Sequence, residues 1–72
     1  MLKDQEIPKL FGKRLKEIRL QRKMSQGDIA RTLGVHRSYI SGIERGIRNP
    51  SLKNIERLAR ALNINPSELL KF

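Results

Sequence analysis

Residues 25–46 read SQGDIARTLGVHRSYISGIERG, and they form the most informative part of the sequence. It contains two short amphipathic segments joined by a break at Gly34, where a glycine adopts a positive φ without the steric penalty that other residues meet. Two helices packed at a steep angle across such a turn form a helix-turn-helix. The apolar or small residues that would hold both helices against a core are Ile29, Ala30, Leu33, Val35, Ile40 and Ile43.

The outward positions of the same stretch carry polar or cationic side chains. Side chains of these types hydrogen bond to base edges and phosphates when a helix lies in the major groove of DNA. The stretch therefore predicts a helix-turn-helix that binds duplex DNA. The outward residues are Arg31, His36, Arg37, Ser38, Tyr39, Ser41 and Arg45.

The charge of the chain agrees with a polyanionic partner. Its 72 residues suffice for one small domain, and 16 Lys and Arg against 7 Asp and Glu give a formal net charge of +9. A domain this basic attracts nucleic acid first and an anionic membrane surface second. The alternative explanation is that the positive charge serves only to keep the protein soluble.

Several functions are not expected from this composition. The chain has no cysteine, and its single histidine, His36, cannot form a metal site alone, so we expect no metal and no cofactor. No nucleophile and base stand in a catalytic arrangement, so we expect no enzyme. A membrane-spanning helix needs about 20 consecutive apolar residues, and no stretch of the sequence approaches this length. We also expect no small-molecule ligand, because the chain has no room for a ligand-binding domain. We expect a cytoplasmic protein with no membrane partner.

The apolar periodicity predicts an all-α fold of five helices without a sheet. Residues 1–6 should be frayed, and residues 7–72 should form a single domain. The first helix is expected from Pro8 to Arg22, with Leu10, Phe11, Leu15 and Ile18 on its apolar face. Ser25 with Asp28 predicts a capping box for the second helix, which ends at Leu33, and the third helix spans 37–45. Ser51 begins a fourth helix whose stripe is Leu52, Ile55, Leu58, Ala59 and Leu62, and Asn65 with Pro66 begins a short fifth helix.

Five motifs in this order resemble the lambda-repressor/Cro-like (XRE-type) helix-turn-helix family. They are SQxxIA at 25–30, LGV at 33–35, YISGIERG at 39–46, RNPSL at 48–52 and LARALNINPSELL at 58–70. Within the family, HRSYISGIERGIRN at 36–49 looks most like the small controller proteins of restriction-modification systems. The resemblance implies a stand-alone dimer that regulates transcription of an endonuclease operon. Antitoxin regulators and phage repressor domains share much of the same pattern.

The predicted base-contacting residues lie on the third helix. Arg37 stands at its start, where a guanidinium can pair bidentately with guanine O6 and N7. Ser38 is short enough to reach a base edge or a phosphate, and Tyr39 resembles a family position near the backbone or the bases. Ser41 lies one turn further on. Gly42 beside it has no side chain with which to contact a base, and a close approach to the duplex would explain a glycine there.

The predicted backbone-contacting residues flank that helix. The resemblance implies a phosphate contact for Gln26, which the amino-terminal dipole of the second helix also favours. His36 stands where relatives commonly have Ser or Thr; an imidazole caps poorly, so we expect it to reach a phosphate or a base. Arg45, Arg48 and Asn49 resemble the backbone-clamping loop of the family. Lys13, Arg14 and Lys53 are further candidates.

Two further groups of residues are predicted to have structural roles, one within the domain and one between two subunits. Arg19 and Glu44 match positions that form an ion pair in relatives, so we expect an architectural pair. One recognition helix contacts too few base pairs for specificity, and a two-fold dimer would present two helices about 34 Å apart to a pseudo-palindromic site. The apolar residues expected at the interface of this homodimer are Leu62, Ile64, Pro66, Leu70 and Phe72.

Two other functions remain open at this point. An antitoxin-type regulator or an interaction module would dock a partner protein through the outer face of the third helix, which is polar here. A basic amphipathic bundle could bind an anionic membrane, although exposed Trp or Phe anchors are lacking. An activator would also contact RNA polymerase, a partner that no segment of the sequence identifies.

Overall fold

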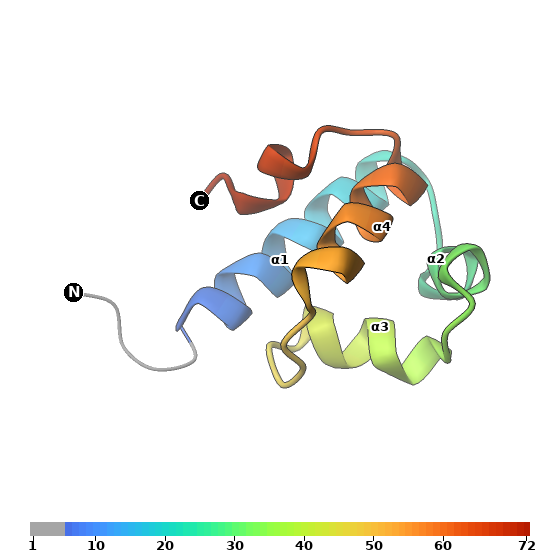
Figure 1. Cartoon of the computed structure of the whole chain (residues 1–72), viewed down its shortest axis with the longest axis horizontal. Coiled ribbons are helices and arrows are strands. Elements are labelled where there is room, and N and C mark those ends of the chain that lie inside the picture. The colour runs from blue at the N-terminus through green and yellow to red at the C-terminus, as the bar shows by residue number, and fades with distance from the viewer. Residues whose placement is uncertain (1–5) are drawn as a thin grey trace.

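The computed structural model describes residues 6–72, which form four α-helices and one 3₁₀ turn (Figure 1). The expectation of a fifth α-helix is therefore wrong, because Pro66–Leu70 is a 3₁₀ segment of five residues. A segment this short closes little more than one turn, and 3₁₀ geometry is common in pieces of this length. The elements are α1 (Glu6–Gln21), α2 (Gln26–Leu33), α3 (Arg37–Glu44), α4 (Leu52–Leu62) and η1 (Pro66–Leu70).

The first helix begins earlier than the sequence predicts. Helix α1 starts at Glu6, so Pro8 is its third residue. A proline is tolerated in the first turn because the N–H groups there have no acceptor within the helix. Of the predicted frayed segment, residues 1–5 lie outside the described residues, and Glu6 is helical.

The predicted caps at Ser25, Gly34, Ser51 and Asn65 are confirmed. Ser25 Oγ accepts a hydrogen bond from the Asp28 N–H at 2.9 Å, and the Ser25 N–H donates to Asp28 Oδ2 at 2.8 Å. These bonds from Ser25 lower the pKa of Asp28. Gly34 ends α2 at φ 72°, which only glycine adopts cheaply. Ser51 caps α4 and Asn65 caps η1 through hydrogen bonds to backbone N–H groups.

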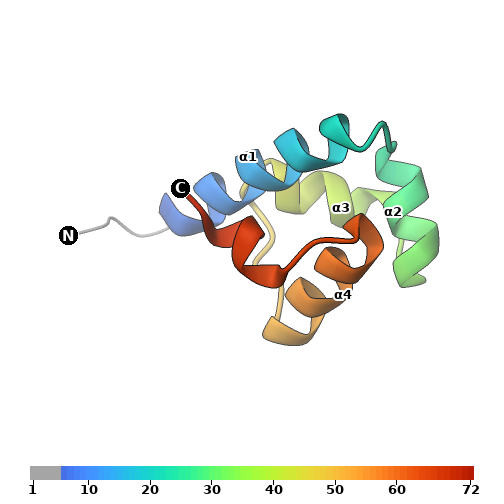
Figure 2. The same cartoon turned by 90° about the horizontal axis from the view of Figure 1, so that it is seen from above.

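A single apolar core lies between the helices. Figures 1 and 2 show α1 running along the molecule, with α3 packed beside it and η1 near its amino-terminal half, while α4 packs against α2 and η1. Leu52, predicted on the apolar stripe of α4, is 84% exposed, because the first residue of α4 lies beyond the core. Among residues 6–72, no helix is long and apolar enough to cross a membrane. The buried apolar residues are Phe11, Leu15, Ile18, Ile29, Ala30, Leu33, Ile40, Ile43, Leu58, Ala59, Leu62 and Leu69.

Gly12 lets α3 lie directly against α1. A Cβ at Gly12 would lie 2.2 Å from the carbonyl oxygen of Ile43 and 2.7 Å from that of Glu44, and both atoms belong to the backbone of α3. Any side chain would therefore push the two helices apart. Gly12 and Arg19 share one face of α1, two turns apart. The close approach at Gly12 thus brings the end of α3 onto the face of α1 that carries Arg19.

Candidate nucleic-acid interface

Helix α3 lies along one edge of the molecule, the lower edge in Figure 1. Ile40 and Ile43 are buried against the core, while Arg37 and Ser38 at its amino end are exposed and Ser41 is half-buried. The helix is thus anchored on one side and presents polar side chains on the other. This is the geometry that insertion into a groove requires.

His36 caps α3, contrary to the expectation that it would cap poorly. Its Nδ1 accepts a hydrogen bond from the Ser38 N–H at 3.1 Å and lies 2.9 Å from Ser38 Oγ. The ring therefore satisfies a free N–H of the first turn, as a Ser or Asn would. It also holds the Ser38 hydroxyl at the exposed end of α3. A contact of the His36 ring with a phosphate stays a prediction.

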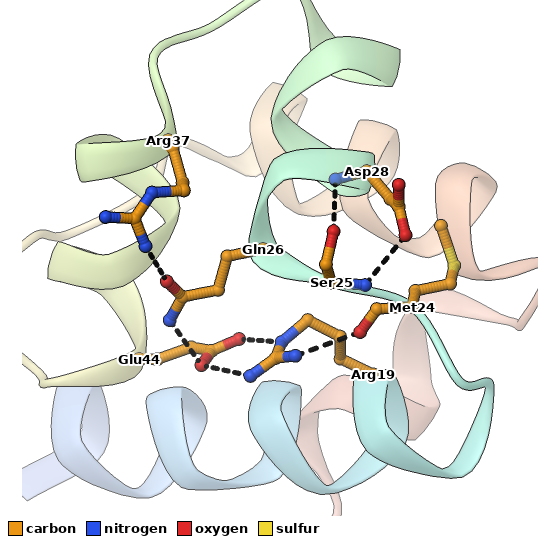
Figure 3. A network of polar contacts seen from close by, with 7 residues as sticks. All are labelled: Arg19, Met24, Ser25, Gln26, Asp28, Arg37 and Glu44. Carbon is orange, nitrogen blue, oxygen red and sulfur yellow. Dashed lines mark hydrogen bonds and ion pairs between the residues drawn. The ribbon is translucent and has the colours of Figure 1, made fainter.

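A chain of hydrogen bonds joins Arg37 to the interior of the molecule (Figure 3). Arg37 Nη1 donates to Gln26 Oε1 at 2.9 Å, and Gln26 Nε2 donates to Glu44 Oε1 at 3.0 Å. Glu44 in turn pairs with Arg19 through two bonds, of 2.6 and 3.0 Å. The structure thus connects Gln26 and Arg37, two predicted DNA contacts, to the predicted ion pair.

The Arg19–Glu44 pair is buried between α1 and α3. The side chains are 9% and 4% exposed, and Arg19 Nη1 also donates to the Met24 carbonyl at 2.9 Å. The hydrogen bonds to Glu44 raise the pKa of Arg19, against the opposing effect of burial, so the guanidinium stays charged. Among residues 6–72, no buried side-chain N or O atom lacks a hydrogen-bond partner. A buried ion pair with all its groups satisfied in this way fixes the placement of α3 on α1.

Tyr39 is held between α3 and α4. Its ring packs half-buried against the core, and its hydroxyl oxygen accepts a hydrogen bond from Asn54 Nδ2 at 2.8 Å. Arg57 donates to Asn54 Oδ1 at 3.1 Å and to the carbonyl of Leu33, the last residue of α2. The hydroxyl proton of Tyr39 stays available to a phosphate or base. Sequence reasoning missed Asn54 and Arg57, because Tyr39 and Leu33, which they contact, lie on other helices.

The loop after α3 is anchored on Gly42. The N–H groups of Ile47 and Arg48 both donate to the Gly42 carbonyl, at 3.0 and 3.2 Å. A Cβ at Gly42 would lie 2.6 Å from Cγ of Arg48, so the aliphatic part of Arg48 lies across this glycine. The glycine therefore accommodates the loop, and a close approach of Gly42 to the duplex stays a prediction. Arg45, Arg48 and Asn49 are all exposed.

Two of the further candidates for phosphate contacts, Lys53 and Arg14, form contacts within the protein. Lys53 Nζ lies 3.0 Å from Glu56 Oε1 on α4. Arg14 Nε donates to the Glu68 carbonyl at 2.8 Å and so ties α1 to η1. The structure therefore does not group Arg14 with the cations that follow α3. No cluster of three or more potential metal ligands occurs within the part of the chain that the structure describes.

One residue of the predicted dimer interface, Leu62, does not lie on the carboxy-terminal surface. Leu62 is 1% exposed and belongs to the core, because it closes the apolar stripe of α4, so it cannot contact a partner. Leu70 and Phe72 are 48% and 55% exposed, Pro66 is exposed and Ile64 is half-buried. Figure 1 shows η1 on the side of the molecule opposite α3. An interface there would leave α3 free.

Known proteins are similar to this chain in sequence and in fold. The helix-turn-helix family model matches residues 15–69. The control protein C.BamHI of Bacillus amyloliquefaciens is 50% identical over 64 residues, which cover 88% of this chain and 79% of that protein. The structure of the restriction-modification controller protein C.AhdI from Aeromonas hydrophila is 50% identical, with a TM-score of 0.83 over 86% of this chain and 94% of that one.

A second solved structure contains DNA. It is the tetramer of the restriction-modification controller protein C.Esp1396I in complex with its natural 35 base-pair operator. It is 32% identical to this chain, with a TM-score of 0.77, and the match covers 92% of this chain and 97% of that one. The chain therefore belongs to the XRE-type helix-turn-helix family of DNA-binding regulators, among relatives that are restriction-modification controller proteins.

Proposed function

We propose that this chain is a transcriptional regulator of the restriction-modification controller type, which binds a pseudo-palindromic operator in double-stranded DNA as a homodimer. The observation that carries the proposal is the exposed amino end of α3, where Arg37 is held by Gln26 at 2.9 Å beside a capped helix terminus. The operator complex of the related C.Esp1396I supports it. The protein acts in the cytoplasm by binding alone, without catalysis or a cofactor.

Base contacts in this proposal come from α3. The guanidinium of Arg37 binds guanine O6 and N7, because its planar fork matches these two acceptors. The Ser38 hydroxyl, held at 2.9 Å from the His36 ring, lies beside it. Ser41 and the Tyr39 hydroxyl contribute further along the helix. The polar character of this face disfavours an antitoxin-type module that docks a protein there, since the centres of protein interfaces are poor in charged groups.

Contacts with the DNA backbone come from both sides of α3. Gln26 is the first residue of α2, where the helix dipole favours a phosphate. Arg45, Arg48 and Asn49 are exposed at the other end of α3. The net charge of +9 supplies the sequence-independent part of the affinity. These contacts position α3, and the residues of α3 specify the sequence.

The proposal is tested by competition between two duplexes at near-physiological salt. One carries an operator selected from random DNA, and the other has the same bases in scrambled order. Specific regulators bind their sites at least about 10³-fold more tightly than other sequences. A ratio near one would show a basic protein that binds any polyanion.

Arg48→Ala is expected to weaken binding to every sequence by a similar factor. A phosphate contact carries no base information, so its loss should reduce the slope of log affinity against log salt by about one per subunit. Fluorescence anisotropy across a salt series measures both quantities. Arg22→Ala, another exposed arginine, is the matched control and should change the slope less. A loss confined to one base position would contradict the assignment of Arg48 to the backbone.

The homodimer in this proposal forms through the carboxy-terminal apolar surface, made of Ile64, Pro66, Leu70 and Phe72. Arg14 of α1 donates to the Glu68 carbonyl at 2.8 Å and pairs with the Glu68 carboxylate at 3.5 Å, so it holds η1 against α1. Two half-exposed apolar side chains on a fixed support suit an interface, and a domain of this size gains stability by association. Because dimerisation depends on concentration, occupancy of the operator would follow the level of the protein.

Leu70→Asp is expected to raise the dissociation constant of the dimer by at least about ten-fold while the monomer stays folded. Burial of a leucine at an interface stabilises association by roughly 1.5–3 kcal/mol, and a buried carboxylate opposes it. Sedimentation equilibrium measures the constant, and circular dichroism checks the fold. Leu20→Asp, at a leucine 56% exposed on α1, is the matched control and should leave the constant unchanged. Equal effects of the two variants would place the interface elsewhere.

A further inference from the structure

We infer that Glu44 is a positioning residue for base recognition: through Gln26 it fixes the direction in which Arg37 points. This inference rests on the proposed function, because it assigns a source of specificity to the same helix. It adds a role to an ion pair that would otherwise be only architectural. The contacts that carry it link α1, α2 and α3 (Figure 3).

The carboxylate of Glu44 is immobile. Its Oε2 accepts from Arg19 Nε at 2.6 Å and its Oε1 accepts from Arg19 Nη2 at 3.0 Å, so both oxygens are held by one planar fork. Arg19 is itself held by the Met24 carbonyl at 2.9 Å. With the Glu44 side chain 4% exposed, water does not compete for these bonds. The position of Glu44 Oε1 is therefore fixed by α1 and by the turn before α2.

The charge of Glu44 determines the orientation of the Gln26 amide. Gln26 Nε2 donates to Glu44 Oε1 at 3.0 Å, which leaves Gln26 Oε1 facing Arg37. The reverse orientation would set the amide oxygen against a carboxylate and the NH₂ group against a guanidinium, and both contacts would be repulsive. The second N–H of Gln26 Nε2 stays free for a phosphate. Gln26 can thus contact the DNA backbone and hold Arg37 at once.

Arg37 gains a fixed direction from this arrangement. The residue is exposed at the start of α3, where an arginine otherwise samples many rotamers. Its bond to Gln26 Oε1 at 2.9 Å uses one of its five N–H groups, and the rest remain for a guanine. Holding a side chain near its bound geometry reduces the entropy that binding costs. Gln26 should therefore contribute to discrimination between bases as well as to affinity.

A double-mutant cycle separates this role from a simple phosphate contact. Wild type, Gln26→Ala, Arg37→Ala and the double variant are each titrated with the selected operator and with an operator changed at the base pair that Arg37 contacts. A good arginine–guanine contact is worth about 5- to 150-fold in discrimination. The measured quantity is the affinity for the selected operator divided by the affinity for the changed operator. Gln26→Ala should lower this ratio by about five-fold or more when Arg37 is present, and should leave it unchanged in the Arg37→Ala background.

The matched control for the cycle is Gln21→Ala, which removes an exposed glutamine at the end of α1. It should leave the ratio unchanged. If Gln26→Ala weakened both duplexes equally in the presence of Arg37, Gln26 would contact only the backbone and the inference would be overturned.

A second measurement tests the relay without DNA. In the free protein, the hydrogen bond to Glu44 should shift the side-chain NH₂ resonances of Gln26 from those of exposed Gln21 and slow their exchange with water. Glu44→Asp keeps the charge that pairs with Arg19 but withdraws the oxygen by one methylene, and should move these resonances toward those of Gln21. Gln26 resonances identical to those of Gln21 in wild type would overturn the inference. Failure of the proposed function would appear separately, as absence of sequence preference in wild type.

Discussion

Glu44→Ala is expected to lower the free energy of unfolding by about 3–5 kcal/mol, because it leaves a buried arginine without its counter-charge. Arg19 is 9% exposed and makes two of its hydrogen bonds to Glu44. A single core in a chain of this size rarely supplies more than about 3–5 kcal/mol of stability, so this loss would leave much of the protein unfolded near 37 °C. Urea denaturation followed by circular dichroism measures the change.

The comparison for this variant is Glu56→Ala on α4. Glu56 also forms an ion pair, with Lys53 at 3.0 Å, but this pair is on the surface, and exposed pairs contribute little to stability. The two variants remove the same side chain from a buried and an exposed pair. If Glu44→Ala cost no more than Glu56→Ala, the Arg19–Glu44 pair would not fix α3 on α1.

Arg37→Ala is expected to remove discrimination at one base position in each half-site of the operator. A bidentate arginine–guanine contact is worth roughly 1–3 kcal/mol of discrimination, and a dimer makes it twice. Affinity for the operator should fall toward affinity for the operator with that base pair changed, while preference at other positions remains. Equilibrium titration of four duplexes, one for each base pair at the position, measures this.

Arg22→Ala is the control for Arg37→Ala, because it removes the same charge from an exposed site outside α3. It should lower affinity for all four duplexes by one common factor. Unchanged sequence preference in Arg37→Ala would show that Arg37 contacts phosphate or solvent and that bases are recognised by another residue.

The parts of the fold that depend on local chemistry could be predicted from the sequence. Ser25 with Asp28, Ser51 and Asn65 each cap an element where the sequence places them, because a cap needs only partners two or three residues away. Gly34 ends α2 for an equally local reason, its positive φ.

Burial was harder to predict, because it depends on how whole elements pack. Leu52 and Leu62 occupy the same predicted stripe of α4, yet one is 84% and the other 1% exposed. Periodicity identifies an apolar face but not where the core ends along a helix. For the same reason the sequence could not separate Leu62, a core residue, from Leu70, which is half exposed.

The candidate site divides in the same way. The position of Arg37 at the start of α3 followed from the turn at Gly34. The hydrogen bond between Gln26 and Glu44 joins residues 18 positions apart, at a place where three helices meet. No local sequence pattern could therefore predict it. Gly12 carried a usable signal, since a glycine inside a helix often marks close packing. The structure shows that α3 lies against it.

Selection from a pool of random duplex DNA at near-physiological salt, followed by sequencing, tests whether the chain recognises a specific DNA sequence. We expect an enriched motif with two-fold symmetry whose half-sites lie about one helical turn, about 34 Å, apart. Guanine should be enriched at a base position in each half-site where Arg37→Ala loses it. Salt-sensitive binding without any enriched motif would contradict sequence-specific recognition, because the chain would then bind DNA through its charge alone.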